Sequence, residues 1–156
     1  ALYLAVDVTK PEVVLRAAGA PPLLLDNEPD DIHSDGLEIF LRLEADAAPY
    51  GFLVVPDPDG DALRVGAVAG FAGAPAMVTG AWSATDTGYL ITLALRIPDW
   101  GTRQGGDRVG FDLLVNEMVP DRERRAGQLV WSGGGGWVWL RGDRQDPARF
   151  GDLELV

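Results

Sequence analysis

The stretch Gly36–Glu44, with the sequence GLEIFLRLE, alternates in character from one residue to the next. Successive side chains of a β-strand point to opposite faces of the sheet, so these residues divide into two sets. The aliphatic set is Leu37, Ile39, Leu41 and Leu43, and the other set is Glu38, Phe40, Arg42 and Glu44. The pattern predicts a half-buried strand whose aliphatic face lies on a hydrophobic core.

Two further segments show the same alternation. The inward-facing residues would be Tyr89, Ile91, Leu93, Leu95 and Ile97 in the first, and Val109, Phe111, Leu113 and Val115 in the second. Shorter apolar segments at 2–8, 50–56 and 62–68 predict additional strands, and turn formers such as PDPDGD at 56–61 separate them. Because several short strands are divided by turns, we expect an antiparallel arrangement.

Helical periodicity is scarce, with a turn or short helix expected only at 11–20 and 146–150. The chain has 156 residues, enough for one domain with a real core. The sequence therefore predicts a single all-β domain over residues 1–156. Its fold would be an antiparallel β-sandwich with jelly-roll or immunoglobulin-like layers.

Composition restricts the partners. The formal net charge is -11, which opposes binding to nucleic acid or to an anionic membrane, because both attract cationic side chains. No apolar run reaches membrane-spanning length, so we expect no membrane partner. The chain has no cysteine, which excludes disulfides, zinc–thiolate sites and thiol catalysis.

Three of the five tryptophans surround a run of four glycines in WSGGGGWVW, residues 131–139. In an extended strand, Trp137 and Trp139 would project from one face about 6.6 Å apart, a spacing that suits stacking on neighbouring sugar rings. The alternative is that this pair belongs to the core. Trp131, beside the glycines, is the stronger candidate for a sugar contact.

The acidic stretch DNEPDDIHSDG, residues 26–36, offers oxygen ligands for calcium. Its carboxylates are Asp26, Glu28, Asp30, Asp31 and Asp35. Their spacing fits no defined calcium loop, so no cofactor is required and a structural calcium ion stays open as an alternative. His33, the only histidine, is interpreted as a polar loop residue that hydrogen-bonds a ligand.

A catalytic role finds no support in these residues. A glycosidase needs two carboxylates that face each other across a cleft. Glu38 and Glu117 are the candidates for such a pair, and nothing in the sequence supports that geometry. We therefore expect a binding domain and not an enzyme.

Several motifs, in order along the chain, resemble the successive motifs of the family 9 carbohydrate-binding modules. They are LYLAVDVT, DGLEIFL, GYLITLALRIP, VGFDLLVNE, RRAGQLVWS and FGDLEL. The resemblance implies a β-sandwich of the kind shared with DOMON-type sugar- and haem-binding domains. It also implies an acid at Glu38, with Asp35 as its neighbour, that faces the ligand or a structural calcium. The polar sugar contacts and the stacking tryptophan would be Asn116, Arg125 and Trp131.

The expected carbohydrate-binding set is Trp131, Glu38, His33, Asn116, Arg125 and Trp137. Its ligand would be a mono- or oligosaccharide. Better-known family members hold a terminal sugar between two tryptophans, one of them just before the acidic strand, where this chain has Ile32 and His33. Half of that clamp is therefore missing.

Family members usually have a further strand before the segment that resembles LYLAVDV. Without it a sheet edge would stay unpaired, so we expect another part of a longer parent polypeptide to supply or cover that edge. No signal peptide is visible at the start of the chain. The resemblance implies an extracellular, periplasmic or cell-surface location.

The leading hypothesis is a non-catalytic carbohydrate-binding module that attaches a larger enzyme to glycan. One alternative is a structural or interaction domain that keeps the fold without a sugar site. Another is a haem-binding relative, in which Met118 or Met77 would ligate iron together with His33 or Lys10.

Overall fold

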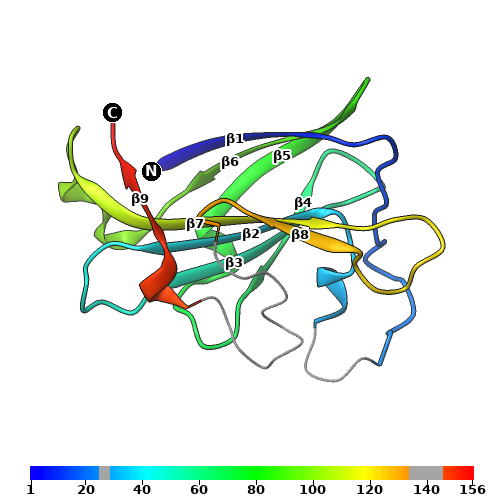
Figure 1. Ribbon diagram of the computed structural model, residues 1–156, viewed down its shortest axis with the longest axis horizontal. Coiled ribbons are helices and arrows are strands. Elements are labelled where there is room, and N and C mark those ends of the chain that lie inside the picture. Colours follow the sequence, from blue (N-terminus) through cyan, green and yellow to red (C-terminus); the bar gives the residue numbers. More distant parts are fainter. Residues whose placement is uncertain (25–28, 134–145) are drawn as a thin grey trace.

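The computed structural model describes residues 1–24, 29–133 and 146–156, which form two facing antiparallel sheets (Figure 1). The strands are β1 (Leu2–Thr9), β2 (Gly36–Arg42), β3 (Tyr50–Pro56), β4 (Leu63–Ala67), β5 (Val78–Thr85), β6 (Gly88–Leu95), β7 (Arg108–Glu117), β8 (Gly127–Val130) and β9 (Gly151–Glu154). Short 3₁₀ turns are η1 (Asp30–Ile32), η2 (Pro75–Met77), η3 (Pro98–Thr102) and η5 (Pro147–Arg149). None of the helices in these ranges is long and apolar enough to cross a membrane.

The smaller sheet has the strand order β1-β6-β5, and the larger sheet has the order β4-β3-β2-β7-β8. β9 pairs with the first half of β7, along the edge that β8 occupies further on. The predicted all-β antiparallel sandwich is confirmed. Of the two segments expected to give a turn or short helix, 11–20 contains a turn closed by Ala20 N–H donating to Ala17 O, and 146–150 contains a single 3₁₀ turn.

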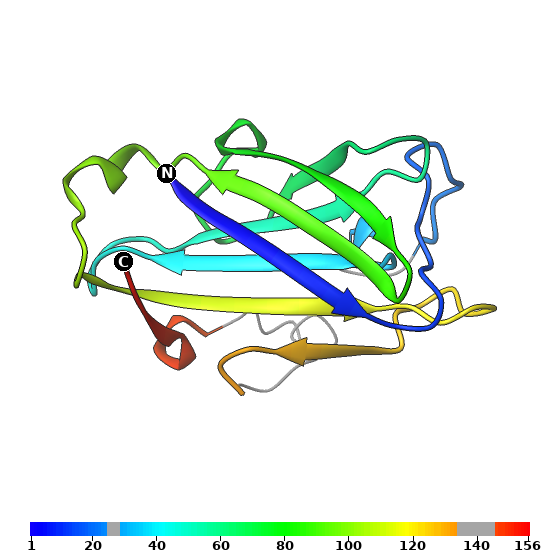
Figure 2. The same ribbon diagram turned by 90° about the horizontal axis from the view of Figure 1, so that it is seen from above.

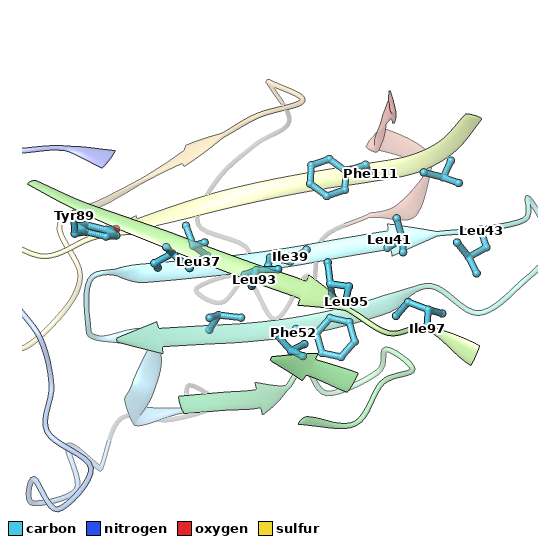
Figure 3. Packing of buried hydrophobic residues seen from close by; sticks show 14 residues of the cluster. Leu37, Ile39, Leu41, Leu43, Phe52, Tyr89, Leu93, Leu95, Ile97 and Phe111 are labelled. Carbon is cyan, nitrogen blue, oxygen red and sulfur yellow. The ribbon is translucent and has the colours of Figure 1, made fainter. Parts of the chain in front are cut away.

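The core between the sheets contains the aliphatic face of β2 and the inward residues of β6. Leu37, Ile39 and Leu41 point toward Leu93 and Leu95 across the interior (Figure 3). The residues predicted to face inward from β7 belong to the same cluster. The predicted core is therefore confirmed.

The outer face of the larger sheet holds a second apolar cluster, centred on Phe40. The Phe40 ring lies 4.9 Å from that of Phe71 and 6.0 Å from that of Phe150, measured between centroids. Ile32, from the 3₁₀ turn before β2, packs in the same cluster. The prediction of a half-buried β2 is therefore wrong: connections between strands cover its second face as well.

A buried carboxylate links the start of β2 to two other parts of the chain. Both carboxylate oxygens of Asp35 accept hydrogen bonds from Lys10 Nζ, at 2.6 and 2.7 Å. The backbone N–H groups of Val14 and Met118 donate to the same carboxylate, at 2.7 and 2.8 Å. Burial raises the pKa of the Tyr89 hydroxyl, and the negative charge of Asp35 raises that pKa further. Asp35 thus fastens the chain after β1, the start of β2 and the end of β7 together.

Replacing Phe40 with alanine tests the burial of the outer face. We expect Phe40→Ala to lower the free energy of unfolding by about 3–5 kcal/mol, the usual cost of deleting a buried aromatic ring. Tyr3→Ala is the control, because Tyr3 is 76% exposed and its removal should change stability by less than about 0.5 kcal/mol. Urea unfolding measures both. Equal stabilities for the two variants would show that the outer face of β2 is open to solvent.

Removing the charge of Asp35 tests the link between the three segments. Asp35→Asn leaves the Lys10 ammonium buried without its counter-ion, and we expect a loss of about 3–5 kcal/mol in unfolding free energy. Glu154→Gln is the matched control, since it breaks an exposed ion pair with Arg108 whose contribution is about 0–1 kcal/mol. The measurement is again denaturant unfolding, and a small effect of Asp35→Asn would contradict the structural role given to this carboxylate.

Candidate functional site

Polar side chains gather on the outer face of the larger sheet, next to the apolar cluster. Glu38 lies on β2, Asn116 on β7 and Gln128 on β8, three strands that are consecutive in the sheet. The register places Asn116 directly opposite Gln128. Glu38 pairs with Leu114, which is two residues before Asn116 on β7. Side chains two residues apart on a strand point to the same face, so Glu38 and Asn116 share one face of the sheet.

The side chains form a compact hydrogen-bond network. Gln128 Nε2 donates to Glu38 Oε1 at 2.8 Å and to Asn116 Oδ1 at 2.7 Å. Arg125 Nη1 lies 3.3 Å from each of the same two oxygens. Two acceptors are therefore each approached by the same two donors, one of which is cationic.

The network is deeply buried. Glu38 and Asn116 are each 1% exposed, and Arg125 is 2% exposed. A buried ion pair with its hydrogen-bond partners is often no more stable than apolar side chains of similar volume, so stability alone does not account for it. Within the described part of the chain, Asn116 Nδ2 is a buried donor without an acceptor. The arrangement therefore has hydrogen-bonding capacity to offer a polar ligand.

His33 contacts this network through the backbone. It follows η1 and is 4% exposed. The backbone N–H of Arg125 donates to His33 Nδ1 at 3.2 Å. The histidine thus lies against the connection between β7 and β8 that carries Arg125.

Trp131 lies on the other face of the sheet. Its backbone N–H continues the β7–β8 ladder by donating to Leu113 O, so its side chain shares the inner face with Leu113. The indole meets the Phe111 ring edge-on, with centroids 5.5 Å apart, and occupies the space that a Cβ on Gly151 would need. It is 52% exposed. The structure therefore does not bring Trp131 together with Glu38, Asn116 and Arg125.

One residue of the expected set remains, and one residue of the network was not in that set. Trp137, with its neighbour Trp139, lies outside the described residues. Gln128 was not predicted from the sequence, although it occupies the polar position of a short strand opposite Asn116. The signal for it was the pairing register, which the sequence alone does not supply.

Three of the five carboxylates considered for calcium have partners within the chain. Both oxygens of Asp35 accept hydrogen bonds, Asp30 pairs with Arg16, and Asp31 pairs with Arg64. In the described ranges no three potential metal-ligating side chains gather, and Asp26 and Glu28 fall outside those ranges.

The two carboxylates considered for catalysis do not converge, and the lysine considered as an iron ligand already has a partner. Glu38 faces outward from the larger sheet, whereas Glu117 has the alternation of its inner face. They cannot face each other across one cleft. Lys10, considered as an iron ligand, has its ammonium group paired with Asp35.

Comparison with known proteins agrees with this architecture. Two solved structures of a family 9 carbohydrate-binding module from Caldicellulosiruptor kristjanssonii, in complex with glucose and with cellotriose, have TM-scores of 0.66 and 0.63 against this chain. Both are 20% identical to it, and they cover 93% and 92% of it. The chain spans just under two thirds of their length, 66% and 64%. No curated protein matches the sequence significantly.

The family model described as carbohydrate family 9 binding domain-like matches residues 1–156. This family consists of binding modules and not of enzymes, as the sequence predicted. Since the match extends over the whole chain, the protein belongs to the family 9 carbohydrate-binding domains.

Proposed function

We propose that the domain binds a mono- or oligosaccharide through Glu38, Asn116, Arg125 and Gln128. The observation that carries the proposal is the buried network of these four side chains on one face of the larger sheet. A sugar hydroxyl both donates and accepts hydrogen bonds. A carboxylate beside a guanidinium and two amides offers both functions within a small volume.

Each member of the network has a distinct task in this proposal. Glu38 accepts hydrogen bonds from hydroxyl groups, while Arg125 and Asn116 Nδ2 donate to hydroxyl oxygens. Gln128 bridges Glu38 and Asn116 and keeps their oxygens in place. Because these groups are held by one another before a ligand arrives, binding orders few side chains.

We infer the chemical class of the ligand from the sugars bound in the similar solved structures. The printed ligands of the Caldicellulosiruptor kristjanssonii module are glucose and cellotriose. We propose glucose-type sugars for this domain too. The alternative of a purely structural domain leaves the cost of the buried network without an explanation.

The domain is further proposed to be part of a longer polypeptide at an extracellular, periplasmic or cell-surface location, where it would attach an enzyme to glycan. Support comes from the family and from the open edge of the smaller sheet. Within the described residues, β1 pairs only with β6. Figure 2 shows β1 crossing above β7, with β8 lying beyond it and no strand of the smaller sheet above β8.

In the part of the chain that the structure describes, the edge of β1 away from β6 has no strand partner, and an apolar surface lies on the facing sheet. Lys10 N–H donates to Thr87 O on the β6 side, so by alternation the even-numbered residues of β1 face β6. The backbone groups that point to the open edge are those of Tyr3, Ala5, Asp7 and Thr9. On the facing sheet, Leu129 is 72% exposed beside Trp131. We propose that an extended strand from the rest of the polypeptide pairs with β1 and covers these two side chains.

Sugar binding is tested by titration calorimetry with glucose and cello-oligosaccharides. We expect Glu38→Gln to weaken binding roughly 10- to 100-fold, because it replaces a charged hydrogen-bond acceptor. Trp131→Ala is the control, since it lies on the opposite face, and its affinity should stay within about twofold. Absence of heat for every sugar would refute the proposed function. A loss of binding in Trp131→Ala alone would move the site to the inner face.

The docked strand is tested by hydrogen exchange at single amides. In the 156-residue chain, the amides of Tyr3, Ala5, Asp7 and Thr9 should exchange fast, while those of Leu4, Val6 and Val8 are protected by β6. In the longer polypeptide proposed above, we expect the amides of both sets to be protected. The docked strand would accept hydrogen bonds from the N–H groups of Tyr3, Ala5, Asp7 and Thr9. Fast exchange of that set in both proteins would contradict the proposal.

A further inference from the structure

We propose that His33 is a positioning residue that makes sugar binding depend on pH, an inference that rests on the proposed function of the Arg125 network. His33 is the only histidine of the chain. Histidine is the side chain whose ordinary titration falls between pH 5 and 8. A single such group in contact with the site gives one defined point at which a proton can act.

The contact joins His33 to the backbone of a residue whose side chain forms part of the network. Arg125 N–H donates to His33 Nδ1 at 3.2 Å, and Arg125 Nη1 reaches Glu38 and Asn116 at 3.3 Å each. The next residue, Ala126, is fixed by its own N–H donating to Glu117 O at 2.6 Å. The β7–β8 connection is thus attached to β7 on one side of Arg125 and to His33 at Arg125 itself.

This hydrogen bond exists in only one protonation state. Nδ1 accepts a hydrogen bond in the neutral imidazole that carries its proton on Nε2. In the imidazolium both nitrogens are donors, so the Arg125 N–H would face another N–H group. The buried backbone donor would lose its acceptor, and a second positive charge would arise beside Arg125. Both effects favour a shift of the connection away from His33.

The carboxylates of the surrounding elements are already engaged by cations. On the chain before His33, Asp30 pairs with Arg16 and Asp31 pairs with Arg64 of β4. After it, Asp35 pairs with Lys10, and on β2 Glu38 pairs with Arg125 itself. An imidazolium would therefore compete with existing ion pairs for each of these carboxylates.

The direction of the effect follows from linkage. If the sugar-binding form of Arg125 requires neutral His33, affinity is full where His33 is neutral and falls as the pH is lowered and His33 takes up a proton. With one proton involved, affinity decreases by up to about tenfold per pH unit once His33 is protonated in the free protein. By reciprocity, sugar binding to the protein with protonated His33 releases a proton.

The test compares glucose and cellotriose affinities at pH 5.0 and 7.5 for wild type, His33→Asn and His33→Ala. Asparagine offers a carbonyl oxygen in place of Nδ1 and does not titrate. We expect wild type to lose roughly 10- to 30-fold in affinity at pH 5.0 relative to pH 7.5. His33→Asn should bind at pH 7.5 within about threefold of wild type and show no pH dependence. His33→Ala should bind weakly at both values.

Two results would overturn this inference while leaving sugar binding intact. One is a wild-type affinity that does not change with pH, and the other is an equal fall in wild type and His33→Asn. If wild type binds neither sugar at pH 7.5, it is the proposed function that fails. The coupling is then judged from hydrogen exchange at the Arg125 amide. After correction for the intrinsic pH dependence of exchange, the Arg125 amide should exchange faster at pH 5.0 in wild type but not in His33→Asn. Equal exchange rates in the two proteins would refute the coupling between His33 and Arg125.

Discussion

The burial of both faces of β2 is the constraint on which the rest of the structure depends. Its aliphatic face forms the core with the smaller sheet, and its other face carries Phe40 under the connections between strands. A strand in the middle of such a sandwich can hold a polar side chain only if that side chain is paired, because an unpaired charge there is costly. Glu38 therefore requires Arg125 and Gln128, and the site is built around the one acid that β2 cannot expose.

The Asp35 and Glu38 carboxylates solve the same physical problem in different ways. Asp35 accepts from Lys10 and from two backbone N–H groups, so its oxygens are used to join segments of the fold. Glu38 accepts from the side chains of Arg125 and Gln128, on a face where Asn116 keeps a donor group without an acceptor in the described residues. The first arrangement is closed to a ligand, and the second can exchange one partner for another. In the proposed function, this difference separates the structural carboxylate of Asp35 from the sugar-binding carboxylate of Glu38.

The sequence predicted much of the fold because alternation is a local property. Leu37 to Leu43 and Tyr89 to Ile97 follow the strand period closely, and their inward faces form the core as expected. The second buried face escaped prediction because it depends on Ile32, Phe71 and Phe150, which lie in connections without a periodic pattern. Gln128 escaped for a related reason: its importance arises from the register between β7 and β8. Glu38, Asn116 and Arg125 were identified through family resemblance, and strand alternation alone would not have assembled them.

The position of Trp131 shows why exposure and ligand binding have to be separated. An indole beside glycines suggested a sugar-stacking surface, and the ring is indeed half exposed. It is exposed, however, on the face that the larger sheet turns toward the smaller one, where it packs on Phe111 and Gly151. Among the described residues the smaller sheet ends at β1, and none of its strands lies above the inner face of β8. A missing neighbour is thus sufficient to explain the accessible tryptophan, and the sugar site is better sought where polar groups are buried together than where an aromatic ring is uncovered.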